Sequence, residues 1–397
     1  MRILFFITIT IVLGHTANIN GLINMTMKKH PSLQAIRHRL SSMDEQISLS
    51  QKFSNPDISF TISDMPFNDF TNRKLEPMQY QSLNIKQKLP WFGKLDARKT
   101  FIQAKKNVIL DSLDAAKVKL ALEIRITAYT IKELEARINI VHKYMGVAKQ
   151  NIKLYTSYAS TDSMSHTNSM NASLLLTKVK IKVAKYKSIL KSQKAKLDYL
   201  VQNRVDSVSD ILTMKKPKSL HYYLTKIKNN PIYKMSISKK GVAVANKEIQ
   251  SLNVKPDPYI KVGYFNRSNY NDYSNITIGA SMPLYGREKL KTQSAQKEVL
   301  EASSVSLDIK SSLKSEVKSM YARLVEARTI YNILNNETLP QLEHMFELTQ
   351  ASIQEGGDLF AYTNLLEQKL DLEEESVSIK AEYLRTQAKL KSLIGEL

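Results

Sequence analysis

Apolar residues recur at alternating intervals of three and four positions along two long stretches of the chain. The first stretch contains Phe101, Ala104, Val108, Ala115, Val118 and Leu122, with Asp111 in one apolar position, and then Ile131, Leu134, Ile138, Val141, Met145, Ala148, Ile152 and Tyr155. The second contains Leu313, Val317, Met320, Leu324, Ala327, Tyr331 and Leu334. This spacing is the heptad pattern of left-handed coiled-coil packing. It predicts very long helices, the first over about 94–160 and on the order of 100 Å long at ~1.5 Å per residue.

A polar turn follows each predicted long helix, and a second helix then returns. The first turn, 157–168, is rich in Ser and Thr and contains Asp162. The second turn contains Glu355, two glycines and Asp358; glycine can end one helix, and Asp358 can cap the next. The returning helices are predicted over about 169–203 and 359–395, so the chain should form two helical hairpins.

Four short segments alternate apolar and polar residues with a period of two, as β-strands do. They lie within 57–63, 83–86, 259–264 and 276–281, and polar connections, about 65–79 and 266–273, link them in pairs. The alternation fits either a half-solvated sheet or a transmembrane barrel with one lipid-facing side. Four strands cannot close a barrel. Even a small closed barrel, whose interior is filled by its own side chains, needs about eight strands. Three chains together would supply twelve.

The chain is an internal duplication. Pro90 in Leu89-Pro90-Trp91-Phe92-Gly93-Lys94 matches Pro283 in Met282-Pro283-Leu284-Tyr285-Gly286-Arg287, an offset of 283 − 90 = 193, and Tyr129 matches Tyr321 at an offset of 192. Each half predicts a short helix, two strands, a Pro-x-x-Gly corner and a long helical hairpin. We therefore predict a first repeat over 18–203, a linker over 204–218 and a second repeat over 219–397.

Composition narrows the class of protein. There are no cysteines, which excludes disulfides, thiolate metal sites and a lipidated N-terminal cysteine. Residues 1–17 combine Arg2, an apolar run over 3–13 and small residues, which predicts a signal peptide; a buried N-terminal strand is the alternative. The net charge of +21 would by default indicate nucleic acid or an anionic surface.

The charges are distributed unequally between the two returning helices. The first carries Lys178, Lys180, Lys182, Lys185, Lys187, Lys191, Lys194 and Lys196. The second carries Glu367, Asp371, Glu373, Glu374, Glu375 and Glu382. The lysines are spread around their helix without stacking aromatics, which argues against a nucleic-acid partner. Basic and acidic helices that alternate around an assembly could set the register between subunits, or each could simply be solvated.

No catalytic arrangement is evident. The seven histidines are scattered, and neither a Ser/His/Asp set nor a carboxylate pair has a suitable spacing. The sequence therefore predicts neither an enzyme nor a bound cofactor.

The order and duplication of several motifs resemble the TolC-like outer-membrane efflux family over nearly the whole chain. The motifs are His30-Pro31-Ser32-Leu33 in the first short helix with Asn230-Pro231 in its repeat, the 87–94 corner, 339–343, 351–356 and 366–370. The corner is most similar to the heavy-metal branch. The resemblance implies a mainly α fold with a small β part, in which three chains form a long α-barrel and a 12-stranded transmembrane β-barrel.

The resemblance also implies a function. Such proteins are passive exit ducts in the outer membrane of Gram-negative bacteria, with the helical part in the periplasm. They work in tripartite efflux or type I secretion with a periplasmic adaptor and an inner-membrane pump, for small toxic solutes or metal ions. A periplasmic coiled-coil adaptor and a cytosolic coiled-coil scaffold that binds anionic partners remain alternatives. An adaptor would have one hairpin, and a scaffold would need neither a signal segment nor duplicated strands.

Two groups of residues are candidate sites within that frame. The family geometry places the hairpin turns at the periplasmic entrance, so Asp162, Glu355 and Asp358 could form rings of carboxylates around the pore, or could only cap helices. Near the first turn, Met164, His166 and Met170 have side chains that suit Cu(I), although scattered Met and His are usually plain loop residues.

The residues of the two corners form a third candidate group. Trp91, Phe92 and Tyr285 are expected at the inner edge of the bilayer as interfacial aromatics, the alternative being core packing. Gly93 and Gly286 are expected to permit the turn from strand to helix.

Overall fold

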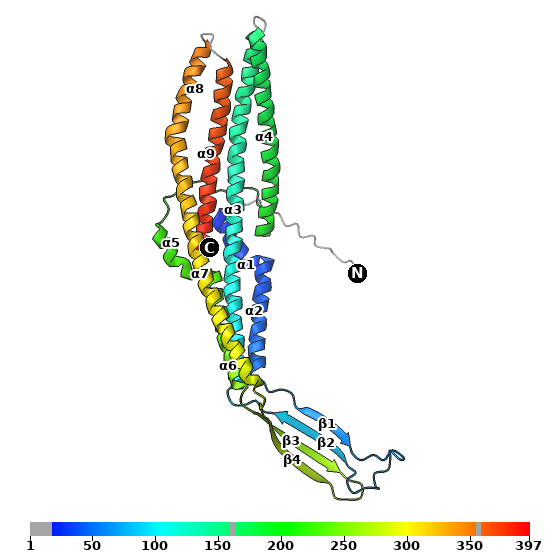
Figure 1. Cartoon of the computed structure of the whole chain (residues 1–397). Helices are drawn as coiled ribbons and strands as arrows, with labels where there is room; N and C mark the ends of the chain where they lie inside the picture. Colours follow the sequence, from blue (N-terminus) through cyan, green and yellow to red (C-terminus); the bar gives the residue numbers. More distant parts are fainter. Residues whose placement is uncertain (1–17, 159–162, 355–358) are drawn as a thin grey trace, which may run out of the picture. The chain divides into compact units, whose positions relative to one another are not determined.

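The computed structural model describes residues 18–158, 163–354 and 359–397 (Figure 1). It is mainly helical, with one small antiparallel sheet. The chain divides into two compact units. The helical unit comprises 1–35, 114–231 and 310–397, and the sheet unit comprises 36–113 and 232–309. Each unit takes residues from both predicted repeats.

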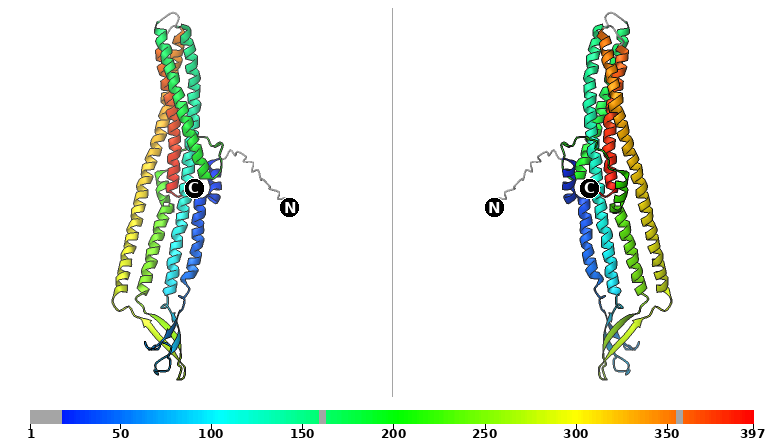
Figure 2. Two further views of the ribbon diagram at one scale, coloured as in Figure 1. Left: turned by 90° about the vertical axis from the view of Figure 1, so that its right-hand side faces the viewer. Right: turned by 90° about the vertical axis from the view of Figure 1, so that its left-hand side faces the viewer.

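Two helical hairpins make up most of the helical unit. The first is formed by the C-terminal part of α3 (Lys94–Tyr158) and α4 (Ser163–Val201). The second is formed by the C-terminal part of α7 (Arg287–Ile333), η2 (Leu334–Thr338), α8 (Leu339–Gln354) and α9 (Leu359–Leu393). Figure 2 shows these helices side by side from two directions. Short helices α1 (Ile19–Lys29), α5 (Leu220–Lys226) and η1 (Ile227–Asn229) complete the unit.

Many of the predicted heptad positions lie in the core of the helical unit, whereas Phe101, Ala104 and Val108 belong to the sheet unit and are only half-buried. Ile131, Val141 and Ala148 of α3 are buried, and Val317 and Leu324 of α7 are fully buried. One cluster joins α3 and α4 to α9, and its buried members are Val141, Tyr144, Ala148, Leu175, Val179, Val183, Leu366 and Leu370. Apolar burial of this kind is the main favourable contribution to helix packing. The prediction of two long hairpins from the three-four spacing is confirmed.

The sheet unit contains helices and all four strands. Its helices are most of α2 (Pro31–Ser50), α6 (Pro231–Leu252) and the N-terminal parts of α3 and α7. Its strands are β1 (Asp57–Ile62), β2 (Gln81–Lys88), β3 (Asp257–Asn266) and β4 (Tyr273–Ser281). They pair antiparallel in the order β1-β2-β3-β4, so the centre of the sheet joins one strand from each repeat.

Each predicted short helix is in fact two segments, because a proline interrupts it. His30 separates α1 from α2 and donates its N–H to the Thr26 carbonyl at 3.0 Å, and Pro31 then begins α2. In the second repeat Asn230 plays the same part before Pro231 and donates its N–H to the Ile227 carbonyl at 2.9 Å. Proline lacks an N–H and is tolerated at the first position of a helix, so each proline marks a new start.

The second long helix also differs from the prediction. Whereas α3 runs through 65 residues, α7 ends in the π-helical turn η2 before α8 begins. Pro340 is the second residue of α8. It has no N–H to donate, and its ring crowds the backbone of the preceding turn. A π turn at this point is a local adjustment of the kind that accompanies such interruptions.

The predicted linker over 204–218 packs against the helical unit. Val205 and Val208 are buried, and Asp198 accepts the Val205 N–H at 2.8 Å. Asp210 accepts the N–H of Ile19 at 2.6 Å, which ties the segment to the start of α1. The repeat boundaries themselves stay a prediction.

Candidate functional site

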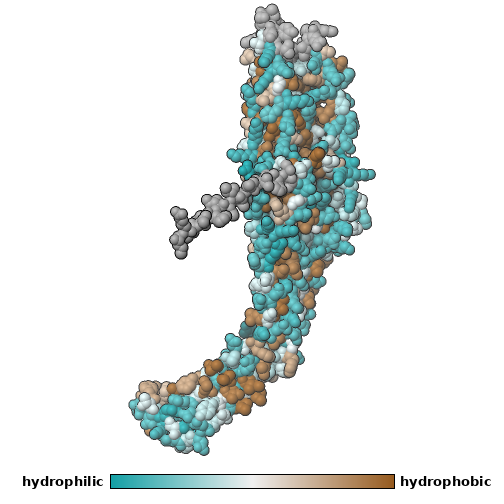
Figure 3. All heavy atoms as spheres, turned by 180° about the vertical axis from the view of Figure 1, so that it is seen from behind, coloured by the Kyte–Doolittle hydropathy of each residue, from teal (hydrophilic) through white to brown (hydrophobic). Residues whose placement is uncertain are grey.

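One face of the sheet is apolar and exposed. Ile58, Ile85, Val262 and Ile276 are direct cross-strand partners and form a row across all four strands. Their exposed fractions lie between 47% and 73%. The same face carries Phe60, Ile62, Leu83, Ile260, Tyr264 and Ile278, all exposed. Figure 3 shows hydrophobic areas over the sheet. A contiguous apolar surface of this kind marks contact with a partner or with lipid.

The opposite face of the sheet is polar. Ser82 and Asn84 are buried there, and the Asn84 amide donates to the Ser82 hydroxyl at 3.0 Å. Lys86 and Lys88 of β2 and Asp257 and Lys261 of β3 lie on the same face, as the period of two requires. The sheet thus separates an apolar side from a hydrated side.

Glycine makes the turn from strand to helix in both repeats. Gly93 has φ +84° and Gly286 has φ +71°, both in the left-handed region that side chains with a Cβ disfavour. Asp257 of β3 fixes the first corner, because it accepts the Trp91 N–H at 2.9 Å and the Lys94 ammonium at 2.8 Å. Both glycines therefore have a backbone conformation that favours glycine.

The corner aromatics point away from the core of the sheet unit. Phe92 is 89% exposed and Tyr285 is 97% exposed, whereas Trp91 is half-buried with its ring centroid 6.1 Å from that of Phe92. Core packing therefore does not account for Phe92 and Tyr285 within one chain. Their assignment to a bilayer edge stays a prediction.

The two connections between paired strands are held by polar side chains. Gln79 is buried, and its amide donates to the carbonyls of Asp64 and Asn72, both at 2.8 Å. In the shorter connection Asp272 accepts the Arg267 N–H at 3.0 Å. Each connection is therefore an ordered turn with a defined backbone.

The charges of the returning helices meet within one chain. Lys178 of α4 lies 2.8 Å from Glu367 of α9, and Lys182 lies 2.6 Å from Asp371 and 2.7 Å from Glu374. Burial lowers the pKa of Lys182, but hydrogen bonds to these two carboxylates outweigh it, and the net effect raises the pKa. Part of the basic-acidic complementarity thus joins the two repeats, which neither sequence interpretation anticipated.

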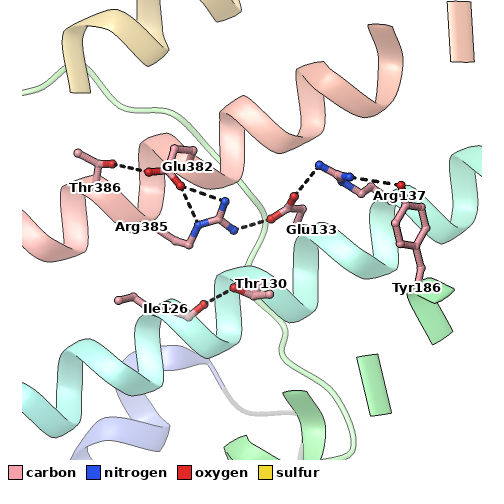
Figure 4. A network of polar contacts seen from close by, with 8 residues as sticks. All are labelled: Ile126, Thr130, Glu133, Arg137, Tyr186, Glu382, Arg385 and Thr386. Atoms are coloured by element: carbon pink, nitrogen blue, oxygen red, sulfur yellow. Dashed lines mark hydrogen bonds and ion pairs between the residues drawn. The ribbon is translucent and has the colours of Figure 1, made fainter. Parts of the chain in front are cut away.

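A second polar network, not recognised from the sequence, is centred on Glu133 of α3 (Figure 4). Glu133 is buried and pairs with Arg137 at 2.9 Å and with Arg385 of α9. Arg137 also donates to the Tyr186 hydroxyl of α4 at 3.3 Å. One carboxylate thereby connects three helices. An acidic residue inside an apolar heptad stretch was the feature that could have revealed it.

The predicted entrance residues and most of the predicted metal residues fall outside what the structure describes. Asp162, Glu355 and Asp358 lie outside the described residues, as do the side chains of Met164 and His166. Met170 lies in α4 and is exposed. Within the described residues, no group of three or more His, Asp or Glu is placed to hold a metal ion.

None of the helices in the described ranges combines the length and the apolar composition that crossing a membrane requires.

The comparisons with known proteins bear on the fold. No family model matches the chain, and no curated protein matches it in sequence. Solved structures of outer-membrane channel proteins do match it. CusC, described in terms of transmembrane channel formation, has a TM-score of 0.80 at 13% identity, covering 96% of this chain and 92% of its own.

Two further matches are similar in extent. The outer membrane protein VceC of Vibrio cholerae has a TM-score of 0.78 at 16% identity, covering 95% of this chain and 96% of its own. The MtrE outer membrane channel of Neisseria gonorrhoeae has a TM-score of 0.78 at 12% identity, covering 96% of this chain and 89% of its own. The scores are nearly equal, so they do not favour the heavy-metal branch. The chain has the fold of these outer-membrane channel proteins, as the sequence resemblance implied.

Proposed function

We propose that this chain is the subunit of a passive exit duct in the outer membrane of a Gram-negative bacterium. The observation that carries the proposal is the four-stranded sheet with an exposed apolar row on one face and polar residues on the other. Lipid on one side and water on the other would satisfy both faces. The shared fold with outer-membrane channels supports the same function.

The duct would be a homotrimer. Strands β1 and β4 are the edges of the sheet in a single chain, with backbone donors and acceptors that require partners in an apolar medium. Pairing β4 of one chain with β1 of the next would give a closed sheet of twelve strands from three chains. The helical hairpins of three chains would then form the periplasmic α-barrel.

Several predicted residues take roles in this proposal. Exposed Phe92 and Tyr285 at the corners would lie at the inner edge of the bilayer with Trp91. At the opposite end of the duct, Asp162, Glu355 and Asp358 would ring the entrance.

The duct would act with a periplasmic adaptor and an inner-membrane pump, in tripartite efflux or type I secretion. The pump would supply the energy and most of the substrate choice, whether for toxic solutes or for metal ions. Met164, His166 and Met170 would be the residues that contact a metal ion in transit.

Cysteine labelling of whole cells tests the topology. The natural chain has no cysteine, so introduced cysteines have no background. Asn68→Cys and Asn271→Cys, in the exposed connections between paired strands, should react with an impermeant thiol reagent on intact cells. Ser312→Cys, on an exposed position of α7, should react only after the outer membrane is broken.

Fractionation and mass complete the test. The detergent-extracted protein should have a mass of about three chains and come from the outer membrane. A monodisperse soluble monomer, or labelling of Asn68→Cys only in broken cells, would exclude the duct and favour an adaptor or a scaffold.

A further inference from the structure

A hollow of about 460 Å³ lies on the polar face of the sheet, at the end where β2 continues into α3. Lys86, Lys88 and Arg98 line it with Tyr259 and Asp257. Lys86, Lys88 and Tyr259 belong to the polar set of the period-two alternation, so the hollow opens on the hydrated face. Three cationic side chains from three positions of the fold therefore converge on one space.

Positive charge exceeds negative charge in and beside this hollow. Asp57 forms an ion pair with Lys88 at 3.8 Å, and Asp257 forms one with the buried Lys94 at 2.8 Å. In the part of the chain that the structure describes, Lys86, Arg98 and Lys261 form no ion pair. Both nearby carboxylates are thus paired with lysines, and Asp257 also interacts electrostatically with Arg98, yet the cationic side chains still outnumber the carboxylates.

The strand register places two of these cations directly opposite each other. Lys86 of β2 is the cross-strand partner of Lys261 of β3. Like charges in this arrangement destabilise a sheet, and an anion between or beside them would relieve the repulsion. The register therefore carries an unfavourable charge arrangement that a negatively charged ligand would correct.

An aromatic platform holds Lys86 in position. Its ammonium lies 4.0 Å from the centroid of the Tyr259 ring, a cation–π contact. The ring in turn covers Gly279, its cross-strand partner in β4, where a Cβ would come within 2.5 Å of the Tyr259 side chain. Only glycine leaves room for the ring there, so the strand pairing itself orients Lys86 toward the hollow.

We propose that this hollow binds small anionic solutes through their phosphate or carboxylate groups. The inference rests on the proposed duct, in which the polar face would line the water-filled interior and would meet solutes in transit. Arg98 provides the planar donor set that suits such groups, and the two lysines add point charges. The hollow would concentrate anions inside the duct, independently of carboxylates at the entrance.

Calorimetry on the purified full-length protein in uncharged detergent tests binding, with pyrophosphate as the probe. The triple variant Lys86→Gln, Lys88→Gln, Arg98→Gln should bind pyrophosphate about tenfold more weakly, because it loses three favourable charge contacts. The matched control Lys180→Gln, Lys187→Gln, Lys191→Gln removes the same charge from exposed positions of α4 and should bind like the natural chain. Equal affinity for all three proteins would overturn the proposal.

Planar bilayers of uncharged lipid test the consequence for transport. We call the triple variant Lys86→Gln, Lys88→Gln, Arg98→Gln the hollow variant and its matched control the α4 control. The reversal potential in a KCl gradient should shift toward cation preference in the hollow variant and stay unchanged in the α4 control. Asp162→Asn with Asp358→Asn should shift it in the opposite direction if those residues line the entrance. An unchanged potential in the hollow variant would overturn the proposed role in transit.

Two further arms separate the alternatives. Vesicles containing phosphatidylglycerol, without free phosphate, should retain the hollow variant and the natural chain equally; selective loss of the variant would identify lipid headgroups as the ligand and overturn a solute site. Pyrophosphate binding without any channel conductance would refute the duct but support the anion site. Channel conductance without any difference in pyrophosphate binding between the variants would support the duct and refute the anion site.

Discussion

The two predicted repeats share an order of elements but differ in the side-chain interactions that stabilise them. Both turn from strand to helix at a glycine with positive φ, Gly93 and Gly286. By contrast, α3 is continuous while its counterpart contains the π turn η2, and α4 is basic where α9 is acidic. The two predicted repeats are thus alike in backbone geometry. Side-chain chemistry is what distinguishes the copies, and it lets a helix of one repeat recognise a helix of the other.

The largest expected effect comes from breaking the network at Glu133, which has no equivalent in the second repeat. The nearby Glu135-Ala136-Arg137 recurs as Glu326-Ala327-Arg328, an offset of 326 − 135 = 191, and this offset makes the fully buried Leu324 the counterpart of Glu133. Glu133→Ala should lower the free energy of unfolding by about 3 kcal/mol, because Arg137 and Arg385 lose their shared partner. Thermal melting followed by circular dichroism measures the loss.

The second repeat suggests the control for this substitution. Glu133→Leu with Arg137→Leu and Arg385→Leu replaces the carboxylate and both of its arginine partners by apolar side chains, and should recover most of the stability. If Glu133→Ala melts like the natural chain, the network contributes nothing to the joining of α3, α4 and α9.

The corner glycines should respond alike, since they are equivalent. Gly93→Ala and Gly286→Ala should each lower the free energy of unfolding, measured by thermal melting, by about 1–2 kcal/mol, because the left-handed backbone disfavours a Cβ. Gly146 is the control: it lies within α3, where an added Cβ meets nothing within 4 Å. Gly146→Ala should stabilise the chain by about 0.5–1 kcal/mol. Opposite effects at the two corners would show that they are not equivalent.

A smaller effect is expected where the unlike helices meet at Lys182. Lys182→Gln should cost about 1 kcal/mol at neutral pH, because it removes two contacts to α9. The folded-state pKa of Lys182 is raised above its ordinary 10.5, so the contribution is present below that pH and is lost as the pH rises through the folded-state value. The melting difference between variant and natural chain should therefore be constant below pH 10.5 and shrink as the pH rises further.

The smallest effect is expected at Lys178, whose pair with Glu367 is more exposed. Lys178→Gln should cost no more than about 0.5 kcal/mol and less in high salt. A larger loss at Lys178 than at Lys182 would mean that burial does not control the strength of these pairs.

The sequence predicted the backbone plan well because that plan is written in local periodicity. The heptad spacing around Val141 and Leu324 identified the long helices and their buried faces, and the alternation around Ile58 and Ile276 identified the strands. The sequence contains Pro31 and Pro231, and each begins a second helix. Where the preceding helix ends depends on the backbone hydrogen bonds of His30 and Asn230, which the sequence does not show.

The features that escaped the sequence depend on three-dimensional pairing. Lys86 is an ordinary polar position of a strand until the register sets it opposite Lys261. Glu133 interrupts an apolar pattern, but its partner Arg385 is 252 residues away. Whether Asp162 and Asp358 form a pore ring or cap a helix depends on how the subunits pack around the axis, which position along the chain does not encode.

The strand order has a consequence for how the chain folds. Strands β2 and β3 are neighbours at the centre of the sheet, yet Lys88 and its partner Tyr259 are separated by 259 − 88 = 171 residues. Helical hairpins form through local contacts and are fast, whereas pairing across so long a loop is slow. The chain should therefore complete its hairpins while the apolar strands are still unpaired, and those strands are its most aggregation-prone segments at that stage. The time between hairpin formation and sheet closure is then the step at which a chaperone for unpaired strands would act.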